Sequence, residues 1–267
     1  MKSLAKCNLV FTMPSSVYLS LLFLIWSAIF FPTFYNYSFI WDDMHLVRAY
    51  TSEELQSVLF GHWDPDKVET AAYRPFATLV YHLQGFFFGE NTICHRVFNL
   101  LLLFSLLQIL VLIAKQLEIP KIQIWVALTI IVFSRIFITL AIWITMSQII
   151  TSYLLITLSV LFFIRSARSR FALNITLSFI FYIVALLTRE ESYILPFLLV
   201  LVTFISDIFK IKKKYYWIAG IMLILLVVHF YIRHLVVKDY MSNKPFNFSY
   251  GGVIYFLSSV WLPGGDY

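Results

Sequence analysis

Long runs of apolar residues, separated by short polar segments, dominate the pattern along the chain. A membrane-spanning helix needs about 20 mostly apolar residues. The pattern predicts seven spans, at residues 17–34, 93–114, 122–140, 143–164, 171–187, 193–209 and 215–235. We therefore expect an all-α polytopic membrane protein in which residues 1–267 form a single transmembrane module.

The composition agrees with this pattern. Of the 267 residues, 61% are hydrophobic and 13% are charged, whereas an average soluble domain has about 45–50% apolar and 25% charged residues. These values exclude a soluble enzyme, a disordered chain and a disulfide scaffold. The two cysteines, Cys7 and Cys94, have no metal-binding spacing.

The basic residues predict an orientation. The N-terminal arm and the loops after the second, fourth and sixth spans carry Lys2, Lys6, Lys115, Lys121, Arg165, Arg168, Arg170, Lys210, Lys212, Lys213 and Lys214. Only Glu118 and Asp207 oppose them there. Because cytoplasmic loops are rich in Lys and Arg, we expect a cytoplasmic N-terminus. The net charge of +6 then reflects topology rather than nucleic-acid binding.

The opposite side would be the periplasmic face of a bacterial inner membrane or the lumen of the endoplasmic reticulum. It has one long loop, residues 36–92. Within it, Thr51 and Glu54 form a capping-box pattern that predicts a short helix. A second helix is expected to begin at Arg74-Pro75, because proline is tolerated in a first turn. Both helices are amphipathic and aromatic-rich, so we expect them to lie flat in the membrane interface.

Asp42 and Asp43 follow the first predicted span. Paired carboxylates can bind a cation or accept a proton from a hydroxyl group. A neighbouring like charge raises the pKa of one of them, which suits a general base. The alternative is that the pair simply begins a solvated loop.

Arg74 stands at the predicted start of a helix near the membrane surface. A guanidinium group and free helix amides would suit a phosphate. The alternative is snorkelling, or an ion pair with Asp64, Asp66 or Glu69.

His95, Arg96 and Asn99 lie at the outer end of the second predicted span. His95 and Asn99 are four residues apart and share a helix face. Polar groups in such positions are usually functional or tie helices together. For Asn99 the sequence favours a tie.

The Thr-Arg-Glu-Glu segment at 188–191 links the fifth and sixth predicted spans. Thr188 and Glu191 fit a capping box, which explains Glu191 well and Arg189 poorly. Arg135 lies within an apolar segment. Its side chain would either face a cavity on the side opposite the cytoplasm or extend to the membrane surface.

Three further polar residues, His229, Arg233 and His234, close the seventh predicted span. Metal binding is not favoured there, because no His-x-x-x-His pairing with a carboxylate is present.

Short motifs follow one another in order along residues 17–235. They are Trp-Asp-Asp at 41–43, Tyr-Arg-Pro-Phe at 73–76, Phe-Gly-Glu-Asn at 88–91, His-Arg-Val-Phe-Asn-Leu-Leu at 95–101, Trp-Ile-Thr-Met-Ser at 143–147 and Leu-Leu-Thr-Arg-Glu-Glu at 186–191. In this order they resemble the GT-C superfamily of membrane glycosyltransferases, above all its protein O-mannosyltransferase-like and tetratricopeptide-linked branches. Gln148 stands near a family arginine, and Arg189 stands in the place of a family lysine.

The resemblance implies transfer of a sugar from a polyprenyl- or dolichyl-phosphate donor to an acceptor hydroxyl on the outer face. Asp42 matches the family's general base and Asp43 the neighbouring acid. The base would deprotonate the hydroxyl, which attacks the anomeric carbon with inversion. The substrate-binding residues that the resemblance implies are Arg74, His95, Arg96, Asn99, Gln148, Arg189 and Glu190. We expect membrane lipids as further partners and neither a metal nor another cofactor.

Members of this superfamily usually have more spans than the seven predicted here. Three interpretations follow: further spans continue after Tyr267, a protein partner completes the site, or the chain is a reduced and inactive relative. The alternative function is therefore a non-catalytic GT-C-like subunit of a larger membrane complex. A transporter is less favoured, because the polar residues cluster near one surface rather than at mid-membrane.

Overall fold

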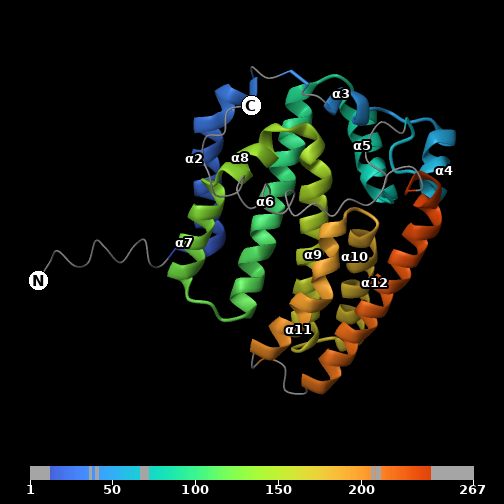
Figure 1. Ribbon diagram of the computed structural model, residues 1–267. Coiled ribbons are helices and arrows are strands. Elements are labelled where there is room, and N and C mark those ends of the chain that lie inside the picture. Colours follow the sequence, from blue (N-terminus) through green and yellow to red (C-terminus); the bar gives the residue numbers. More distant parts are fainter. Residues whose placement is uncertain are drawn as a thin grey trace, which may run out of the picture.

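The computed structural model describes residues 13–35, 38–39, 42–66, 72–205, 208 and 212–241, and the regular structure in these ranges is entirely helical (Figure 1). The α-helices are α2 (Ser15–Tyr35), α3 (Asp43–Leu46), α4 (Ser52–Phe60), α5 (Pro75–Phe88), α6 (Thr92–Gln116), α7 (Lys121–Val132), α8 (Arg135–Ile142), α9 (Ser147–Ser166), α10 (Phe171–Leu186), α11 (Leu195–Ile205) and α12 (Lys212–Met241). The 3-10 helices are η1 (Ile144–Met146) and η2 (Glu190–Ile194). Trp41, Glu69, Asp207, Lys210 and the N-terminal arm lie outside the described residues.

Successive long helices run in opposite directions, so their connections alternate between two ends of the molecule (Figure 1). One end carries α3, α4 and α5 together with η1 and η2. The other end carries the connections from α6 to α7 and from α9 to α10, and the start of α12. The basic residues there are Lys115, Lys121, Arg165, Arg168, Arg170, Lys212, Lys213 and Lys214. Which side of a membrane this end faces stays a prediction.

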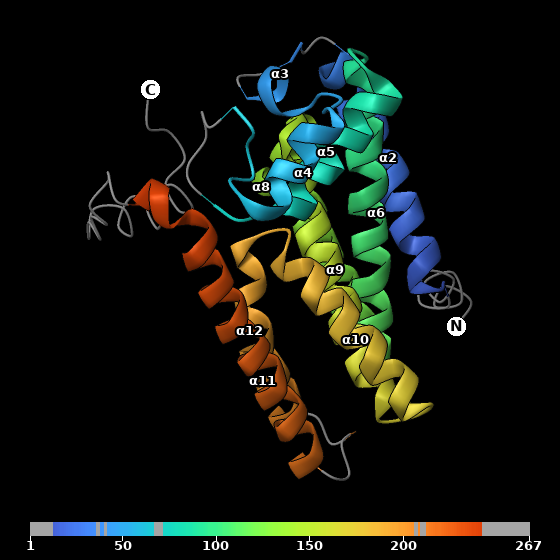
Figure 2. The ribbon, with the colours of Figure 1, turned by 90° about the vertical axis from the view of Figure 1, so that its right-hand side faces the viewer.

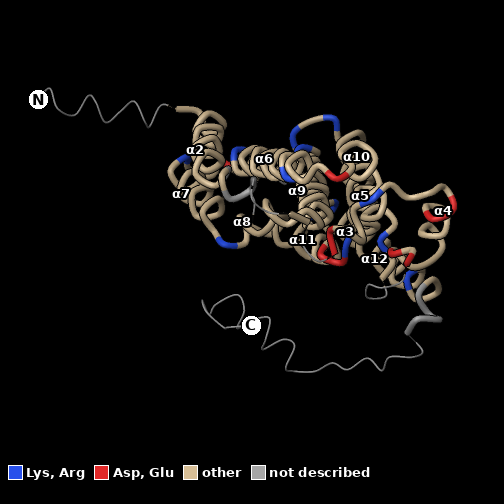
Figure 3. The backbone as a smooth tube through the Cα atoms, turned by 90° about the horizontal axis from the view of Figure 1, so that it is seen from above, with Lys and Arg blue, Asp and Glu red and all other residues tan. Residues whose placement is uncertain are grey.

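Three apolar clusters hold the helices together. Seen from above, the helices form a flattened row from α2 and α7 to α12, with α6 and α9 between them (Figure 3). One cluster joins α2, α6, α7, α8 and α9, and a second joins α9, α10, α11 and α12 (Figure 2). A third cluster lies within the long loop at 36–92 and at its contact with η1, and includes Leu46, Trp63, Tyr81 and Ile144. This third cluster supports the polar groups described below.

Three helices in the described part of the chain are long and apolar enough to cross a membrane: Thr92–Gln116, Ile144–Ser166 and Lys212–Val236. A fourth span is added if α7 and α8 are counted as one broken span. These helices agree with an all-α membrane protein. The apolar helices in α2 and α10 are shorter, and the total of seven spans stays a prediction.

Two of the predicted spans are not continuous helices. The segment 122–140 divides into α7 and α8, which are bent by 57°. The bend follows from a local cap, because the Ser134 side chain accepts a hydrogen bond from the amide of Phe137 and starts a new helix. The segment 193–209 begins in η2, and α11 continues it for only 11 residues in the described range.

The two predicted helices of the outer loop are confirmed. The Thr51 side chain accepts a hydrogen bond from the Glu54 amide, and the Glu54 carboxylate accepts one from the Thr51 amide, so α4 begins with the expected capping box. Helix α5 begins at Pro75. Its outer side exposes the large apolar residues Leu79, Leu83, Phe86 and Phe87. This apolar side is the feature expected of an interfacial helix.

Gly85 allows α5 to approach the chain that follows α3. A Cβ atom at this position would lie 2.2 Å from the backbone carbon of Arg48 and 2.5 Å from the backbone nitrogen of Ala49. Backbone atoms cannot move aside as a flexible side chain can. The absence of a side chain at Gly85 therefore sets the distance between α5 and the segment 48–49.

We predict that Gly85→Ala lowers the free energy of unfolding by about 1–3 kcal/mol, the usual cost of overpacking. Gly220 in α12 is the matched control, because a Cβ atom there meets nothing within 4 Å. Gly220→Ala should leave stability unchanged or raise it by up to about 1 kcal/mol through helix propensity. Thermal unfolding of the detergent-solubilised chain measures both. Equal stability of the two variants would contradict the close contact at Gly85.

Candidate functional site

The two carboxylates after the first helix are held by the turn between α8 and α9. The indole Nε1 of Trp143 donates to Asp42 Oδ1 at 2.9 Å, and the Thr145 hydroxyl lies 3.3 Å from both Asp42 oxygens. The Thr145 amide donates to Asp43 Oδ1 at 2.9 Å. Asp43 is fully buried, whereas Asp42 is half-buried. Asp42 is therefore the more accessible carboxylate.

Tyr81 of α5 contacts the turn that holds these carboxylates. It is fully buried, and its hydroxyl donates to the Thr145 carbonyl at 2.8 Å. Burial raises the pKa of Tyr81 well above its usual value, while the charges of Arg189, Asp42 and Arg74 also act on it. Tyr81 is thus a neutral hydroxyl, within electrostatic reach of the carboxylate and the guanidinium groups.

Arg74 is paired with Glu190. Its Nε and Nη2 atoms lie 2.8 and 2.7 Å from Glu190 Oε2, and Arg233 of α12 approaches Oε1 of the same carboxylate at 3.4 Å. Burial alone would raise the pKa of Glu190, but the two guanidinium groups outweigh it, so the pKa is lowered. Two guanidinium groups thus share one carboxylate, which leaves one positive charge in excess among these three residues.

The alternative partners that the sequence offered for Arg74 are used elsewhere. Asp64 lies 3.1 Å from His45, and Asp66 lies 3.1 Å from Arg48. Glu69 is outside the described residues. Arg74 instead finds its partner 116 residues along the chain.

His229 of α12 lies beside this group of charges. Its ring is near Tyr73 and Tyr193, with centroid distances of 6.1 and 5.7 Å. The residue is 6% exposed, and neither ring nitrogen has a hydrogen-bond partner among the described residues. The Nε atom of Arg233 is also buried without a partner there. Unsatisfied polar atoms beside an excess positive charge suit an anionic ligand.

Arg189 pairs with a neighbour rather than with Asp42 or Asp43. Its Nε donates to the two oxygens of Glu191 at 3.0 and 2.9 Å. The predicted capping box of Thr188 and Glu191 is wrong: the Thr188 hydroxyl donates to the Val184 carbonyl. The residue before η2 is Arg189, and its side chain makes no cap. Glu191 instead serves as the ion-pair partner of Arg189.

The polar residues at the start of α6 are fully or almost fully buried and bind other segments. His95 contacts the Gly89 carbonyl at 2.9 Å and Gln84 at 3.3 Å. Arg96 donates to the carbonyls of Ser38 and Ile142 at 2.9 and 3.1 Å. Each of these contacts joins α6 to the outer loop or to the end of α8.

Asn99 is the interhelical tie that the sequence favoured. Its Nδ2 atom lies 3.0 Å from the Trp143 carbonyl, 3.3 Å from that of Leu140 and 3.4 Å from that of Ile144. Helix ends leave carbonyls without intrahelical partners. Asn99 therefore closes the end of α8 and holds the turn that binds Asp42 and Asp43.

Gln148 and Arg135 have different environments. Gln148 is 6% exposed at the start of α9, and its Oε1 atom has no hydrogen-bond partner in the described structure. Arg135 is exposed at the start of α8. The structure therefore buries Gln148 near the Trp143–Thr145 turn, whereas Arg135 does not face an enclosed cavity.

Six of the nine predicted site residues thus fall into two groups. Asp42, Asp43, Arg96 and Asn99 bind the segment 142–145. Arg74 pairs with Glu190 of η2, which Arg233 of α12 also approaches. Sequence reasoning missed Tyr81 and the role of Arg233. Arg233 was considered only as part of a metal site, and no signal distinguished Tyr81 from the other aromatic residues of α5.

A cavity of about 760 Å³ lies beside the site, between the α3 segment and α5. Its lining consists of Ser38, Phe39, Met44, Val47, Arg48, Ala49, Gly85, Gly89, Glu90 and Thr92. None of the predicted site residues lines it.

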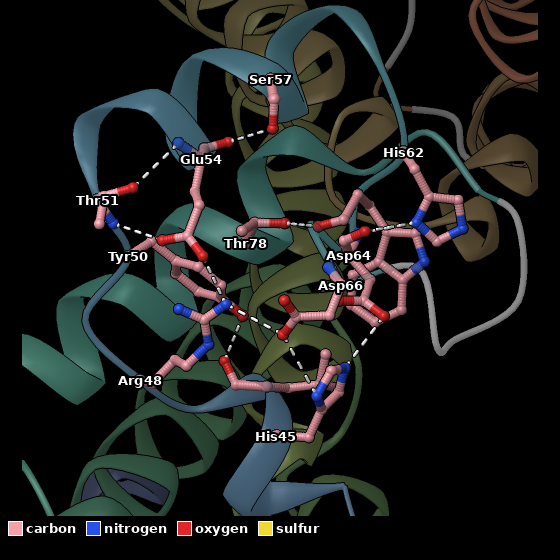
Figure 4. Close-up of polar contacts among 12 residues, drawn as sticks. His45, Arg48, Tyr50, Thr51, Glu54, Ser57, His62, Asp64, Asp66 and Thr78 are labelled. Carbon is pink, nitrogen blue, oxygen red and sulfur yellow. Dashed lines mark hydrogen bonds and ion pairs between the residues drawn. The ribbon is translucent and has the colours of Figure 1, made fainter.

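One cluster in the described part of the chain has the composition of a metal site. It consists of His45, Asp64 and Asp66 in the outer loop (Figure 4). None of these residues was a predicted site residue, and the sequence led us to expect no metal.

No family model, curated protein or solved structure matches this chain. The resemblance to the GT-C superfamily therefore rests on the order of the motifs alone.

We predict that Glu190→Gln lowers the free energy of unfolding at neutral pH by roughly 1–3 kcal/mol, because it leaves two guanidinium groups without their counter-charge. The folded pKa of Glu190 lies below its ordinary 4.5. The ionised carboxylate therefore stabilises the fold above about pH 4.5, and this contribution is lost as the pH falls through the folded pKa.

Unfolding measured between pH 7 and pH 3 should show the gap between wild type and Glu190→Gln shrinking on acidification. Glu118→Gln is the control, because Glu118 is 80% exposed in its pair with Arg168. Glu118→Gln should lower the free energy of unfolding by no more than about 1 kcal/mol. A gap for Glu190→Gln that stays constant with pH would contradict the ion pair.

Proposed function

We propose that the chain is a GT-C-like membrane module that transfers a sugar from a polyprenyl- or dolichyl-phosphate donor to an acceptor hydroxyl. In this proposal seven spans cross the membrane and the N-terminus is cytoplasmic. The end with α3, α4 and α5 then faces the periplasm or the lumen of the endoplasmic reticulum. The single observation that carries the proposal is an oriented, half-buried carboxylate, Asp42, at the same end of the molecule as two guanidinium groups that share the one carboxylate of Glu190 (Figure 1).

Asp42 is the proposed general base. Its oxygens accept hydrogen bonds from Trp143 and Thr145, which orient the carboxylate. Proton transfer to a positioned carboxylate typically contributes about 10²–10⁴-fold to a rate. In the proposed reaction the acceptor hydroxyl loses its proton to Asp42, and its oxygen bonds to the anomeric carbon. The bond from that carbon to the phosphate oxygen breaks on the opposite side.

Arg74 and Arg233 are the proposed ligands of the leaving phosphate. They share only one carboxylate, Glu190, so a phosphate would supply the missing negative charge. Arginine suits this task because its planar fork binds phosphate oxygens in pairs. His229 and the unpaired Nε of Arg233 would supply further polar contacts. Two other arginines that the resemblance implied as substrate-binding residues, Arg189 and Arg96, are already bound to Glu191 and to backbone carbonyls.

The second candidate is a non-catalytic subunit of a larger membrane complex. The burial of Asp43 and its hydrogen bond with the Thr145 amide favour it, because these give the acidic pair a role in holding the fold. In this case Asp42 can be replaced without loss of function.

Asp42→Asn tests the first candidate, because asparagine keeps an acceptor oxygen for Trp143 but cannot take a proton. In membranes of cells that produce the chain, with a supplied polyprenyl-phosphate sugar, transfer should fall at least about 100-fold. Arg233→Ala should instead weaken donor binding by about 10-fold or more, the loss expected for a charged hydrogen bond.

Glu53→Gln is the control, since Glu53 is an exposed acid on α4. Glu53→Gln should change neither the rate of sugar transfer nor the affinity for the donor. Transfer that survives Asp42→Asn at the wild-type rate would rule out the base and favour the subunit. Unchanged donor affinity in Arg233→Ala would rule out the phosphate site.

A further inference from the structure

The outer loop contains a histidine and two aspartates that face one another. His45 Nε2 lies 3.1 Å from Asp64 Oδ2, and His45 Nδ1 lies 3.5 Å from Asp66 Oδ2 (Figure 4). One ligand atom from each residue can be chosen so that all lie within 4.8 Å of one another. Zinc binds nitrogen and oxygen ligands at about 2.0–2.2 Å, so two adjacent ligands are about 3.4 Å apart in a tetrahedral site. One ion binds a single ring nitrogen of His45, so only one of the 3.1 and 3.5 Å distances can separate two of its ligands. The other carboxylate has an oxygen within 4.8 Å of the chosen atoms, and its side chain has to turn toward the ion.

The cluster is built on a backbone that is already fixed. The Asp64 amide donates to His62 Nδ1 at 3.0 Å, and the Asp66 amide donates to Asp64 Oδ1 at 3.1 Å. The Thr78 hydroxyl of α5 donates to the Trp63 carbonyl. Asp64 itself is 1% exposed, and its second oxygen, Oδ2, points to His45 (Figure 4). A buried carboxylate beside an imidazole differs from a solvated acidic surface, and in metal sites such a carboxylate orients the ligating histidine.

The charges around the cluster also favour a divalent cation. Asp64, Asp66 and Glu54 are acidic, and Arg48 is the cation bound to both Asp66 and Glu54, at 3.1 and 2.7 Å. Hydrogen bonds from Arg48 and the Thr51 amide lower the pKa of Glu54 to about 2, so Glu54 is ionised. With a neutral imidazole, these groups carry two negative charges in excess. A single divalent ion neutralises them.

We propose that His45, Asp64 and Asp66 bind one divalent transition-metal ion, with zinc as the best match to one nitrogen and two oxygen ligands. Asp64 is the stronger carboxylate ligand, because Arg48 shares the Asp66 oxygen that faces the cluster. The ion connects α3 to the loop at 62–66. Because the amides of His45 and Leu46 donate to the Asp42 carbonyl at 3.2 and 2.9 Å, it also stiffens the segment that carries Asp42.

The competing explanation is a metal-free cluster in which a protonated His45 donates to both carboxylates. The two explanations differ in the number of zinc ions bound per chain, and this number can be measured directly. The chain is purified in detergent without a polyhistidine tag and stripped with a chelator. It is then dialysed against micromolar zinc chloride and analysed by elemental mass spectrometry. We expect about one zinc ion per chain.

His45→Ala and Asp64→Asn should abolish this binding, and Asp66→Asn should weaken it less than Asp64→Asn does. His234→Ala and Glu53→Gln are the matched controls, because both residues are exposed and lie outside the cluster. Zinc should raise the thermal unfolding midpoint of wild type and of both controls, but not that of His45→Ala. This second readout shows whether the ligand variants are folded.

Two results would overturn the proposal. One is a wild-type chain that binds less than about one fifth of an equivalent of zinc. The other is zinc binding that persists in both His45→Ala and Asp64→Asn. Asp42→Asn separates this proposal from the proposed glycosyl transfer, because that variant should bind zinc as the wild type does whatever its activity.

Discussion

A carboxylate buried in an apolar protein has to be paired, and the pairing of Asp43 with the Thr145 amide joins the outer loop to the helical bundle. Without a partner, an ionised group in such a place is destabilising by several kcal/mol. The turn between α8 and α9 supplies the partner. Its carbonyls also accept hydrogen bonds from Tyr81 and Asn99. One short turn therefore satisfies polar groups that come from α3, α5 and α6.

Features that depend on neighbouring residues could be predicted from the sequence. The capping box of α4 has both partners within four residues, and Pro75 restricts its own backbone. The role of Asn99 as a tie was also predicted, because polar groups at the end of a span often join helices. Its partners could not be named, since they depend on where α8 ends.

The distant pairing of charges could not be predicted. The sequence offered Asp64 and Asp66 as partners of Arg74, but folding brings Glu190 to it from 116 residues away. The helix boundaries failed for a related reason. Hydropathy is averaged over a long window, so one capping serine inside an apolar run does not alter it. Yet Ser134 caps a new helix at the point where the chain bends by 57°.

The dependence of the outer loop on the turn at 143–146 has a consequence for biosynthesis. Asp43 leaves the ribosome 102 positions before Thr145, whose amide it binds, and Arg96 leaves it 46 positions before Ile142, whose carbonyl it binds. Contacts so distant along the chain cannot form until the intervening helices have been made. Until then these charged groups have to stay in water. The loop made early in synthesis is therefore among the last parts to reach its final structure.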